Sequence, residues 1–322
     1  LLFPFYKFSN IKNKVEIFDT MPSIMKKHLK TDISWSLPIQ PIKECNSVKT
    51  KETNLAVSGG IFANVLVNLR LKEIKNVKEF FVFPHMGDGG ISAGAAAFVS
   101  ELHGEKVIPI NNSYLGPSFS EAKCKIEIKN SKLIYEKPKN LEKKIAELLH
   151  NGKIIGLFQG KMEYGPRALG NRSILVGTTD KNINQSLNKR LSRTEFMPFA
   201  PITLEKFAKK NYKNWTKKSH TSYYMTSCYY CTNELTNNSP AVVHIDKTAR
   251  PQVITKKINP ILTKILEEYY KISKIPSLIN TSYNLHEEPI VLNPKEALSL
   301  LRGNGVDVVA MPPFLIFNKK RH

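Results

Sequence analysis

The chain has 322 residues, 41% of them hydrophobic and 23% charged, an ordinary composition for a globular protein with room for two domains. Its net charge of +21 suggests an anionic partner, but lysines are spread along the whole chain, so charge alone indicates nucleic acid only weakly. Apolar runs such as 93–99 are too short to cross a bilayer, and four cysteines are too few for a disulfide framework, so we expect a cytoplasmic protein with reduced thiols.

After an irregular, lysine-rich start, the first third of the chain alternates between strands, glycine turns and helices. A short buried strand with a glycine pair, 54–60, precedes a helix over 61–74 whose apolar residues recur at helical spacing. A second strand, 80–90, runs into another glycine turn and a helix of small residues over 91–104. Repeated strand, turn and helix predicts an α/β layer.

A connector rich in Pro, Asn, Gly and Ser, IPINNSYLGPSFS, follows, and we place the domain boundary at its start, giving domains 1–105 and 106–322. The second domain has four expected helices: LEKKIAELLHNG, NINQSLNKRLS, NPILTKILEEYYKISK and NPKEALSLLRGNG. Its expected strands are KIIGLF, SILVGTT, PFAPITL, AVVHID, SLINTSYN, VDVVAM and FLIF. The last helix carries Asn293 at the N-cap and Pro294 at the first helical position. This pattern predicts a second α/β module.

The segment KMEYGPRALGNRSIL, residues 161–175, has the residue types of an anion site at a strand edge. Arginine donates two parallel N–H bonds to phosphate or carboxylate and keeps its charge. Glycines on both sides let the backbone turn and approach a ligand, and Arg167 and Arg172 are close enough in sequence to meet at one anion. A solvated basic loop is the competing interpretation, because no P-loop-type glycine motif accompanies the arginines.

Further polar residues lie at the ends of expected elements, and each has a structural alternative. Arg190 lies in the last turn of a helix, where a cation also complements the helix dipole. Ser282 and Asn284 follow a strand, where small polar side chains either bind phosphates or cap a turn. Asp88, in a glycine turn, is either an N-cap or a metal ligand. Cys228 and the cysteine three residues later lack the second pair that a zinc site needs.

Six segments match, in order, the pattern of one enzyme family. They are LAVSGGIFANVLVNLRL, FVFPHMGDGGISAGAAA, GKMEYGPRALGNRSIL, LNKRLSRTEFMPFAPITLE, HIDKTARPQ and NTSYNLHEEPIVLNPKEAL. The chain resembles the ATP-dependent O-carbamoyltransferases of the NodU and CmcH type over roughly residues 53–317. The resemblance implies an incomplete TsaD-like module with a partial actin-like, sugar-kinase type of α/β fold over 1–105, followed by a YrdC-like α/β module over 106–322.

In such enzymes the YrdC-like module makes carbamoyl-adenylate from carbamoyl phosphate and ATP, and the TsaD-like module passes the carbamoyl group to a hydroxyl of a sugar-like or natural-product acceptor. The resemblance assigns catalytic roles to Lys161, Arg167, Arg172, Ser173, Arg190 and Arg250. It assigns nucleotide contacts to Gly59, Gly60, Asn64, Ser282 and Asn284, and metal ligation to Asp88.

The resemblance also implies iron, or another divalent metal, whose two histidine ligands are absent from this chain. We therefore expect a longer protein, a separate N-terminal half or a homodimer to complete the TsaD-like module. An RNA-binding module related to tRNA modification and an inactive fragment are the alternative functions. RNA contact would depend steeply on salt. The charged clusters here lie on glycine turns beside strands, which favours a nucleotide pocket and makes nucleic acid the weaker expectation.

Overall fold

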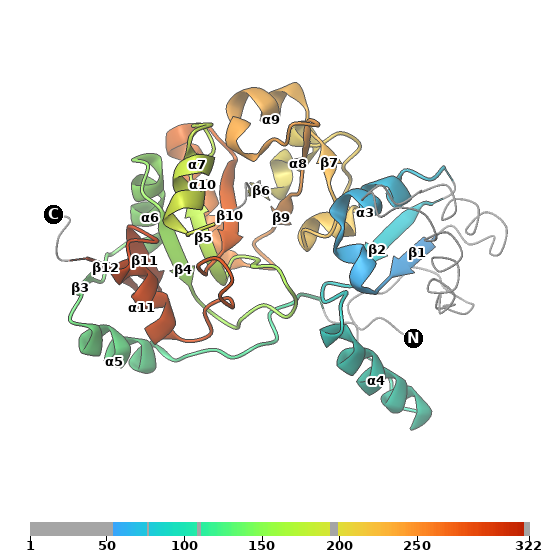
Figure 1. Cartoon of the computed structure of the whole chain (residues 1–322), viewed down its shortest axis with the longest axis horizontal. Helices are drawn as coiled ribbons and strands as arrows, with labels where there is room; N and C mark the ends of the chain where they lie inside the picture. Colours follow the sequence, from blue (N-terminus) through green and yellow to red (C-terminus); the bar gives the residue numbers. More distant parts are fainter. Residues whose placement is uncertain (1–53, 76, 108–110, 194–198, 319–322) are drawn as a thin grey trace. The chain divides into compact units, whose positions relative to one another are not determined.

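The chain forms a mixed α/β fold that divides after Asn111 into two compact units, here called unit 1 and unit 2 (Figure 1). The computed structural model describes residues 54–75, 77–107, 111–193 and 199–318. The irregular start predicted for the N-terminal region lies outside these residues. None of the described helices is both long enough and apolar enough to span a membrane. The prediction of an α/β fold is confirmed.

Unit 1 contains two parallel strands, β1 (Asn54–Val57) and β2 (Glu79–Val82). The helix predicted over 61–74 forms as two pieces, a 3-10 helix η1 (Gly60–Ala63) and α3 (Val65–Lys72). The break falls at Asn64, whose side chain accepts the backbone N–H groups of the first turn of α3. Asparagine favours this N-cap position over the interior of a helix, which explains why the longer helix does not form.

Unit 1 ends in α4 (Gly89–Leu102), the predicted helix of small residues. Only Ala97 of this helix is buried. Ile91 and Leu102 are each 69% exposed and Phe98 is 52% exposed, so apolar side chains line an uncovered face of the helix. This face contributes no core to the described part of unit 1.

Unit 2 is built on an eight-stranded sheet in the order β3-β12-β11-β4-β5-β10-β6-β9. The strands are β3 (Ile134–Glu136), β4 (Ile155–Phe158), β5 (Arg172–Val176), β6 (Ala200–Leu204), β9 (Gln252–Ile254), β10 (Ser277–Ser282), β11 (Val308–Met311) and β12 (Phe314–Phe317). Neighbours are antiparallel except β11 with β4 and β6 with β9. The ends of β4 and β10 therefore lie at the same edge of the sheet as the starts of β5, β6 and β9, and we call this the site edge.

Helices cover both faces of this sheet (Figure 1). On one face, α6 (Leu141–His150) and α10 (Pro260–Ser273) pack against strand residues such as Ile155 and Leu157. The helices of the other face are α5 (Glu121–Ser131), α7 (Ile183–Arg190) and α11 (Pro294–Arg302). Burying each large aliphatic side chain contributes roughly 1.5–3 kcal/mol, so this double layer gives the site edge a rigid support.

Most elements predicted for unit 2 form, but the predicted strand AVVHID is wrong. Its first residues instead continue a 3-10 helix, η3 (Pro240–Val242), because proline suits the first position of a helical turn. Its last residues enter a tight turn, since the Asp246 carboxylate accepts both the N–H and the hydroxyl of Thr248. The short strands β7 (Tyr229–Tyr230) and β8 (Thr248–Ala249) pair nearby.

Three helices of unit 2 are missing from the sequence prediction: α5, α8 (Glu205–Asn211) and α9 (Asn233–Asn238). The start of α5 carried a usable signal, because Ser120 caps it by accepting the N–H of Lys123. A second capped start is Thr232 at α9, which accepts the N–H of Leu235. Both helices are short or weakly amphipathic, so periodicity alone gave no indication of them.

Candidate anion-binding site

The loop 159–171 joins β4 to β5 at the site edge and contains most of the segment singled out in the sequence. Arg172, the first residue of β5, is fully buried, and its guanidinium lies 3.8 Å from the centre of the Phe158 ring. It donates to the carbonyl oxygens of Gln159 (2.6 Å), Asn171 (3.0 Å) and Pro117 (3.2 Å). Arg172 therefore holds the base of the loop together through its two terminal nitrogens, which donate to backbone carbonyl groups, while its buried Nε has no partner.

Glu163 holds the same loop from the opposite side. Its side chain is 7% exposed, and Oε1 accepts the backbone N–H groups of Leu169 (2.7 Å), Asn171 (2.7 Å) and Arg172 (3.2 Å). Burial raises the pKa of Glu163, while these N–H groups act to lower it. One carboxyl oxygen thus binds three backbone N–H groups on either side of Gly170. Gly170 has a φ of 107°, a conformation that favours glycine.

The carbonyl groups of the loop are held in the same way. Three buried amide side chains donate to successive carbonyl oxygens: Asn280 to Ala168 (3.1 Å), Gln252 to Leu169 (2.7 Å) and Gln159 to Gly170 (2.9 Å). The remaining N–H, that of Gly170, donates to Ser173 Oγ at 2.8 Å. The N–H groups of residues 169–172 and the carbonyl groups of residues 168–170 are therefore all held by hydrogen bonds, which fixes the backbone that follows the first arginine of the loop.

That residue is Arg167, and it lies close to Arg250, which precedes β9 at the same edge. Both are partly buried. Burial and the positive charge of Arg250 lower the pKa of Arg167 to about 9. Burial also lowers the pKa of Arg250, and the thiol of Cys228 lies near enough to influence both arginines. Arg167 and Arg250 are therefore near enough to Cys228 for its thiol to influence the pKa of both guanidinium groups.

Among the described residues, no carboxylate pairs with Arg167 or Arg250. The Nε of Arg167 is buried without a hydrogen-bond partner. Buried cations are normally paired, so two adjacent guanidinium groups without a counter-charge store electrostatic free energy that an anion would release. A guanidinium group can donate parallel N–H bonds to two oxygens at once, which is the arrangement that phosphate and carboxylate groups offer.

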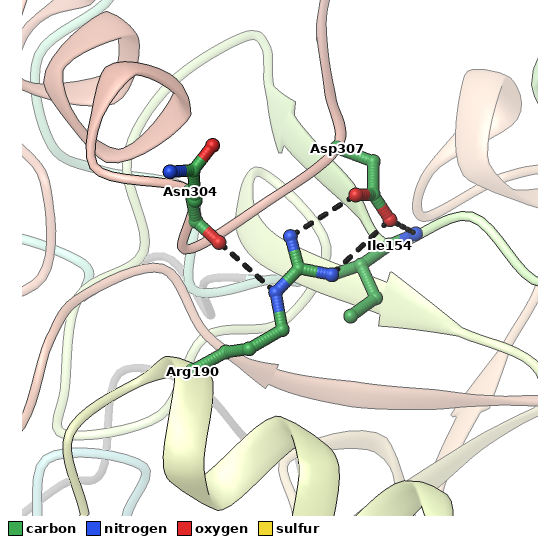
Figure 2. Close-up of polar contacts among 4 residues, drawn as sticks. All are labelled: Ile154, Arg190, Asn304 and Asp307. Atoms are coloured by element: carbon green, nitrogen blue, oxygen red, sulfur yellow. Dashed lines mark hydrogen bonds and ion pairs between the residues drawn. The ribbon is translucent and has the colours of Figure 1, made fainter. Parts of the chain in front are cut away.

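Arg190, the last residue of α7, makes an ion pair and a hydrogen bond with residues near the start of β4 and of β11 (Figure 2). Its guanidinium binds both oxygens of Asp307, at 3.1 and 3.3 Å, and its Nε donates to the carbonyl oxygen of Asn304 at 2.9 Å. Asp307 Oδ2 also accepts the N–H of Ile154, immediately before β4. This cluster is at the end of β4 opposite to the loop 159–171, so Arg190 is not brought to the arginine pair.

Of the other residues predicted in unit 2, some hold the backbone by hydrogen bonds and others lie at the site edge without a structural partner of that kind. Lys161 is exposed, and Ser173 is fully buried with its Oγ bound to Gly170. Ser282 ends β10 at the site edge, opposite Ser173. Asn284 follows it, with Nδ2 donating to the carbonyl oxygen of Glu288 at 2.6 Å and Oδ1 buried without a partner. The site edge thus brings Arg167, Arg250 and Ser282 to one side of the sheet.

The residues predicted in unit 1 form no comparable cluster within its described part. Gly59 and Gly60 are exposed in the turn after β1, and Asn64 caps α3. Asp88 is exposed at the start of α4 and makes no capping hydrogen bond. No three His, Cys, Asp or Glu side chains of the described residues group as metal ligands. Asp88 has no companion ligands there, so the donor set does not fit a metal, and iron stays a prediction.

Sequence reasoning missed the residues that hold the loop, above all Glu163. The sequence did contain a signal, because Glu163 is the single acidic residue in a glycine-rich segment, 161–175, that also contains three basic residues. The sequence placed Arg193 with Arg190 among the cations at a helix end, but Arg193 lies beyond α7, donates to Thr281 Oγ1 at 3.0 Å and lies 5.1 Å from the centre of the Phe199 ring. Cys228 and Cys231 are buried and are not joined in a disulfide, and burial raises the pKa of Cys231 to about 12.

Comparison with known protein families decides the assignment. The model described as carbamoyltransferase C-terminus matches residues 146–318, and that described as carbamoyltransferase N-terminus matches residues 27–97. The chain belongs to the carbamoyltransferase family. The family suggested by the six sequence segments is therefore confirmed, and the C-terminal family region contains the loop 159–171 and both arginines of the pair.

Relatives of this family extend over most of the chain. Uncharacterized protein MJ1058 of Methanocaldococcus jannaschii is 35% identical over 280 residues, which are 84% of this chain and 45% of that protein. Nodulation protein NolO of Bradyrhizobium diazoefficiens is 30% identical over 275 residues, 83% of this chain and 50% of that protein. The chain thus spans about half the length of the curated relatives it matches. Among solved structures, full-length HypF in a phosphate- and nucleotide-bound form aligns with a TM-score of 0.40 and 19% identity over 58% of this chain and 22% of HypF.

Proposed function

We propose that unit 2 forms carbamoyl-adenylate and that the whole protein is an O-carbamoyltransferase. One observation carries this proposal: Arg167 and Arg250 lie near enough at the site edge for their charges to interact, and neither has a carboxylate partner among the described residues. Family membership supplies the carbamoyl chemistry, and the arginine pair supplies a place for the phosphates of ATP and carbamoyl phosphate. Pyrophosphate and phosphate are the anions released.

The reaction gathers several negative groups in one place. Water first cleaves carbamoyl phosphate to carbamate and phosphate. A carbamate oxygen then attacks the α-phosphorus of ATP, the bond to the bridging oxygen breaks, and pyrophosphate leaves with that electron pair. Positioned cations lower the barrier because they offset the repulsion between the attacking carbamate and the phosphate oxygens.

In this reaction Arg167 and Arg250 bind the leaving pyrophosphate, and Ser282 and Asn284 contact the nucleotide from the end of β10. Arg172 and Ser173 hold the loop that presents Arg167. Fixing the loop before substrate arrives reduces the conformational entropy that binding must overcome. In the transfer step, an acceptor hydroxyl attacks the carbamoyl carbon of the adenylate, AMP leaves, and the hydroxyl proton passes to solvent. We propose a sugar-like or natural-product alcohol as the acceptor.

Isotope exchange tests this function directly. The full chain is incubated with ATP, carbamoyl phosphate and radiolabelled pyrophosphate, and we expect label to enter ATP only when carbamoyl phosphate is present. The Arg250→Ala variant should lower the exchange rate by about 100-fold, as expected for loss of a charge-assisted contact worth ~3 kcal/mol. The matched control, Asp307→Asn, removes charge from the ion pair at the other end of β4 and should exchange at the normal rate. Equal rates with and without carbamoyl phosphate would contradict the proposed reaction.

A further inference from the structure

Glu163 is a buried acidic residue only four residues from Arg167, yet its carboxyl group is not placed as the counter-charge of that arginine. The groups that influence the pKa of Arg167 are Arg250 and Cys228, not Glu163. Oε1 is instead occupied by three backbone N–H groups at 2.7–3.2 Å. The buried Oε2 has no hydrogen-bond partner. The carboxylate therefore acts on the backbone of the loop, and the positive charge of the arginine pair is left uncompensated.

We propose that Glu163 is a positioning residue of the anion site: it gathers the N–H groups of Leu169, Asn171 and Arg172 and thereby sets the direction in which Arg167 reaches the anion. This inference rests on the proposed function. It assigns a role to a side chain that contacts neither substrate nor guanidinium pair. Its Oε1 accepts all three N–H groups at 2.7–3.2 Å, so a single buried atom ties together three points of the turn.

Glutamine cannot replace Glu163 at this position, although it has the same size. An amide has one acceptor oxygen and one NH2 group with two donors. If the oxygen took the place of Oε1, the NH2 group would bring two N–H donors to the site of Oε2, a buried position where the carboxyl oxygen makes no hydrogen bond. If the amide were turned over, its donors would face the three backbone N–H groups. Either arrangement leaves buried donors unpaired, at a cost of about 1–3 kcal/mol each, and loosens the turn before Arg167.

A double-mutant cycle tests the proposal, with inorganic pyrophosphate as the probe and isothermal titration calorimetry on the full chain as the measurement. We expect Glu163→Gln to raise the Kd about tenfold and Arg167→Ala to raise it by more. In the Arg167→Ala background, Glu163→Gln should have no further effect, because the group through which it acts is gone. In the Arg250→Ala background, Glu163→Gln should still weaken binding.

Amide hydrogen exchange gives a second readout with an internal control. Glu163→Gln should speed exchange at Leu169, Asn171 and Arg172, which donate to the carboxylate, and leave Gly170, which donates to Ser173, less affected. Ser173→Ala should give the reverse pattern. Exchange that accelerates across the whole of unit 2 in Glu163→Gln would mean a general loss of stability and would overturn the positioning role.

The outcomes separate this inference from the function on which it rests. If Arg167→Ala and Arg250→Ala leave pyrophosphate binding unchanged, the anion site itself is wrong, and the role of Glu163 falls with it. If the arginine variants lose binding while Glu163→Gln binds normally, or weakens binding equally with and without Arg167, only the positioning role is overturned. Should Glu163→Gln fail to fold, Glu163→Asp, which keeps the charge but shortens the side chain, enters the same cycle with the same criteria.

Discussion

Two arginines at opposite ends of β4 show how differently the same side chain is used in unit 2. Arg190 is 22% exposed on its side chain and binds both oxygens of Asp307, with a further bond to a backbone carbonyl (Figure 2). Arg167 has a buried Nε without a partner and a second arginine as its neighbour. A paired guanidinium contributes to the fold, whereas a guanidinium held beside a like charge is ready to bind an anion from outside.

We expect the largest effect on pyrophosphate binding when one of the two arginines without a carboxylate partner, Arg250, is removed. Arg250→Ala should raise the Kd for pyrophosphate about 100-fold, equivalent to ~3 kcal/mol, in calorimetric titration. The melting temperature of the free protein should stay the same or rise, because the repulsion between Arg167 and Arg250 is relieved. Saturating pyrophosphate should raise the melting temperature of the unaltered chain and not that of the variant. A large fall in the melting temperature of the free variant would place Arg250 with Arg190 as a structural residue.

Breaking the ion pair of Arg190 should have the opposite result, a loss of stability with no change in pyrophosphate binding. Asp307→Ala removes the counter-charge of Arg190 and the acceptor for the N–H of Ile154, so it should lower the free energy of unfolding by about 2 kcal/mol. Urea denaturation measures this loss. The Kd for pyrophosphate in native buffer should remain unchanged, since the cluster lies at the end of β4 away from the loop. Weakened anion binding in a variant that is still folded would show that the two ends of the strand are coupled.

The resemblance of six sequence segments predicted the family, and strong periodicity and clear helix caps predicted most elements of unit 2. Asn293 does cap α11 by accepting the N–H of Glu296, as its spacing predicted. The same sequence could not rank the arginines of the candidate site. Arg167 and Arg172 look alike in a glycine-rich segment, but the charge of Arg167 is influenced by a second arginine, whereas Arg172 donates to backbone carbonyl oxygens.

The difference arises from long-range contacts that no local pattern contains. The loop that presents Arg167 is held by amides from distant strands, Asn280 and Gln252, each more than 80 residues away in the chain. Arg190 is identified as structural only by Asp307, 117 residues further on. Pairing partners of charged residues are set by sheet order, and sheet order follows from the whole fold rather than from any one segment.

The smallest effect is expected from a change that keeps the charge but alters its titration. Lysine loses its proton about two pH units below arginine in water, and the burial and like charge that lower the pKa of Arg167 to about 9 would act on a lysine there as well. Arg167→Lys should therefore bind pyrophosphate almost normally at pH 6 and lose charge and affinity as the pH rises toward 8. The ratio of the Kd of the variant to that of the unaltered chain should grow by about tenfold over this interval, and the ratio cancels the titration of pyrophosphate itself. The exposed control, Arg302→Lys, should give a ratio near one throughout, and a flat ratio for Arg167→Lys as well would show that position 167 is solvated and is not held beside Arg250.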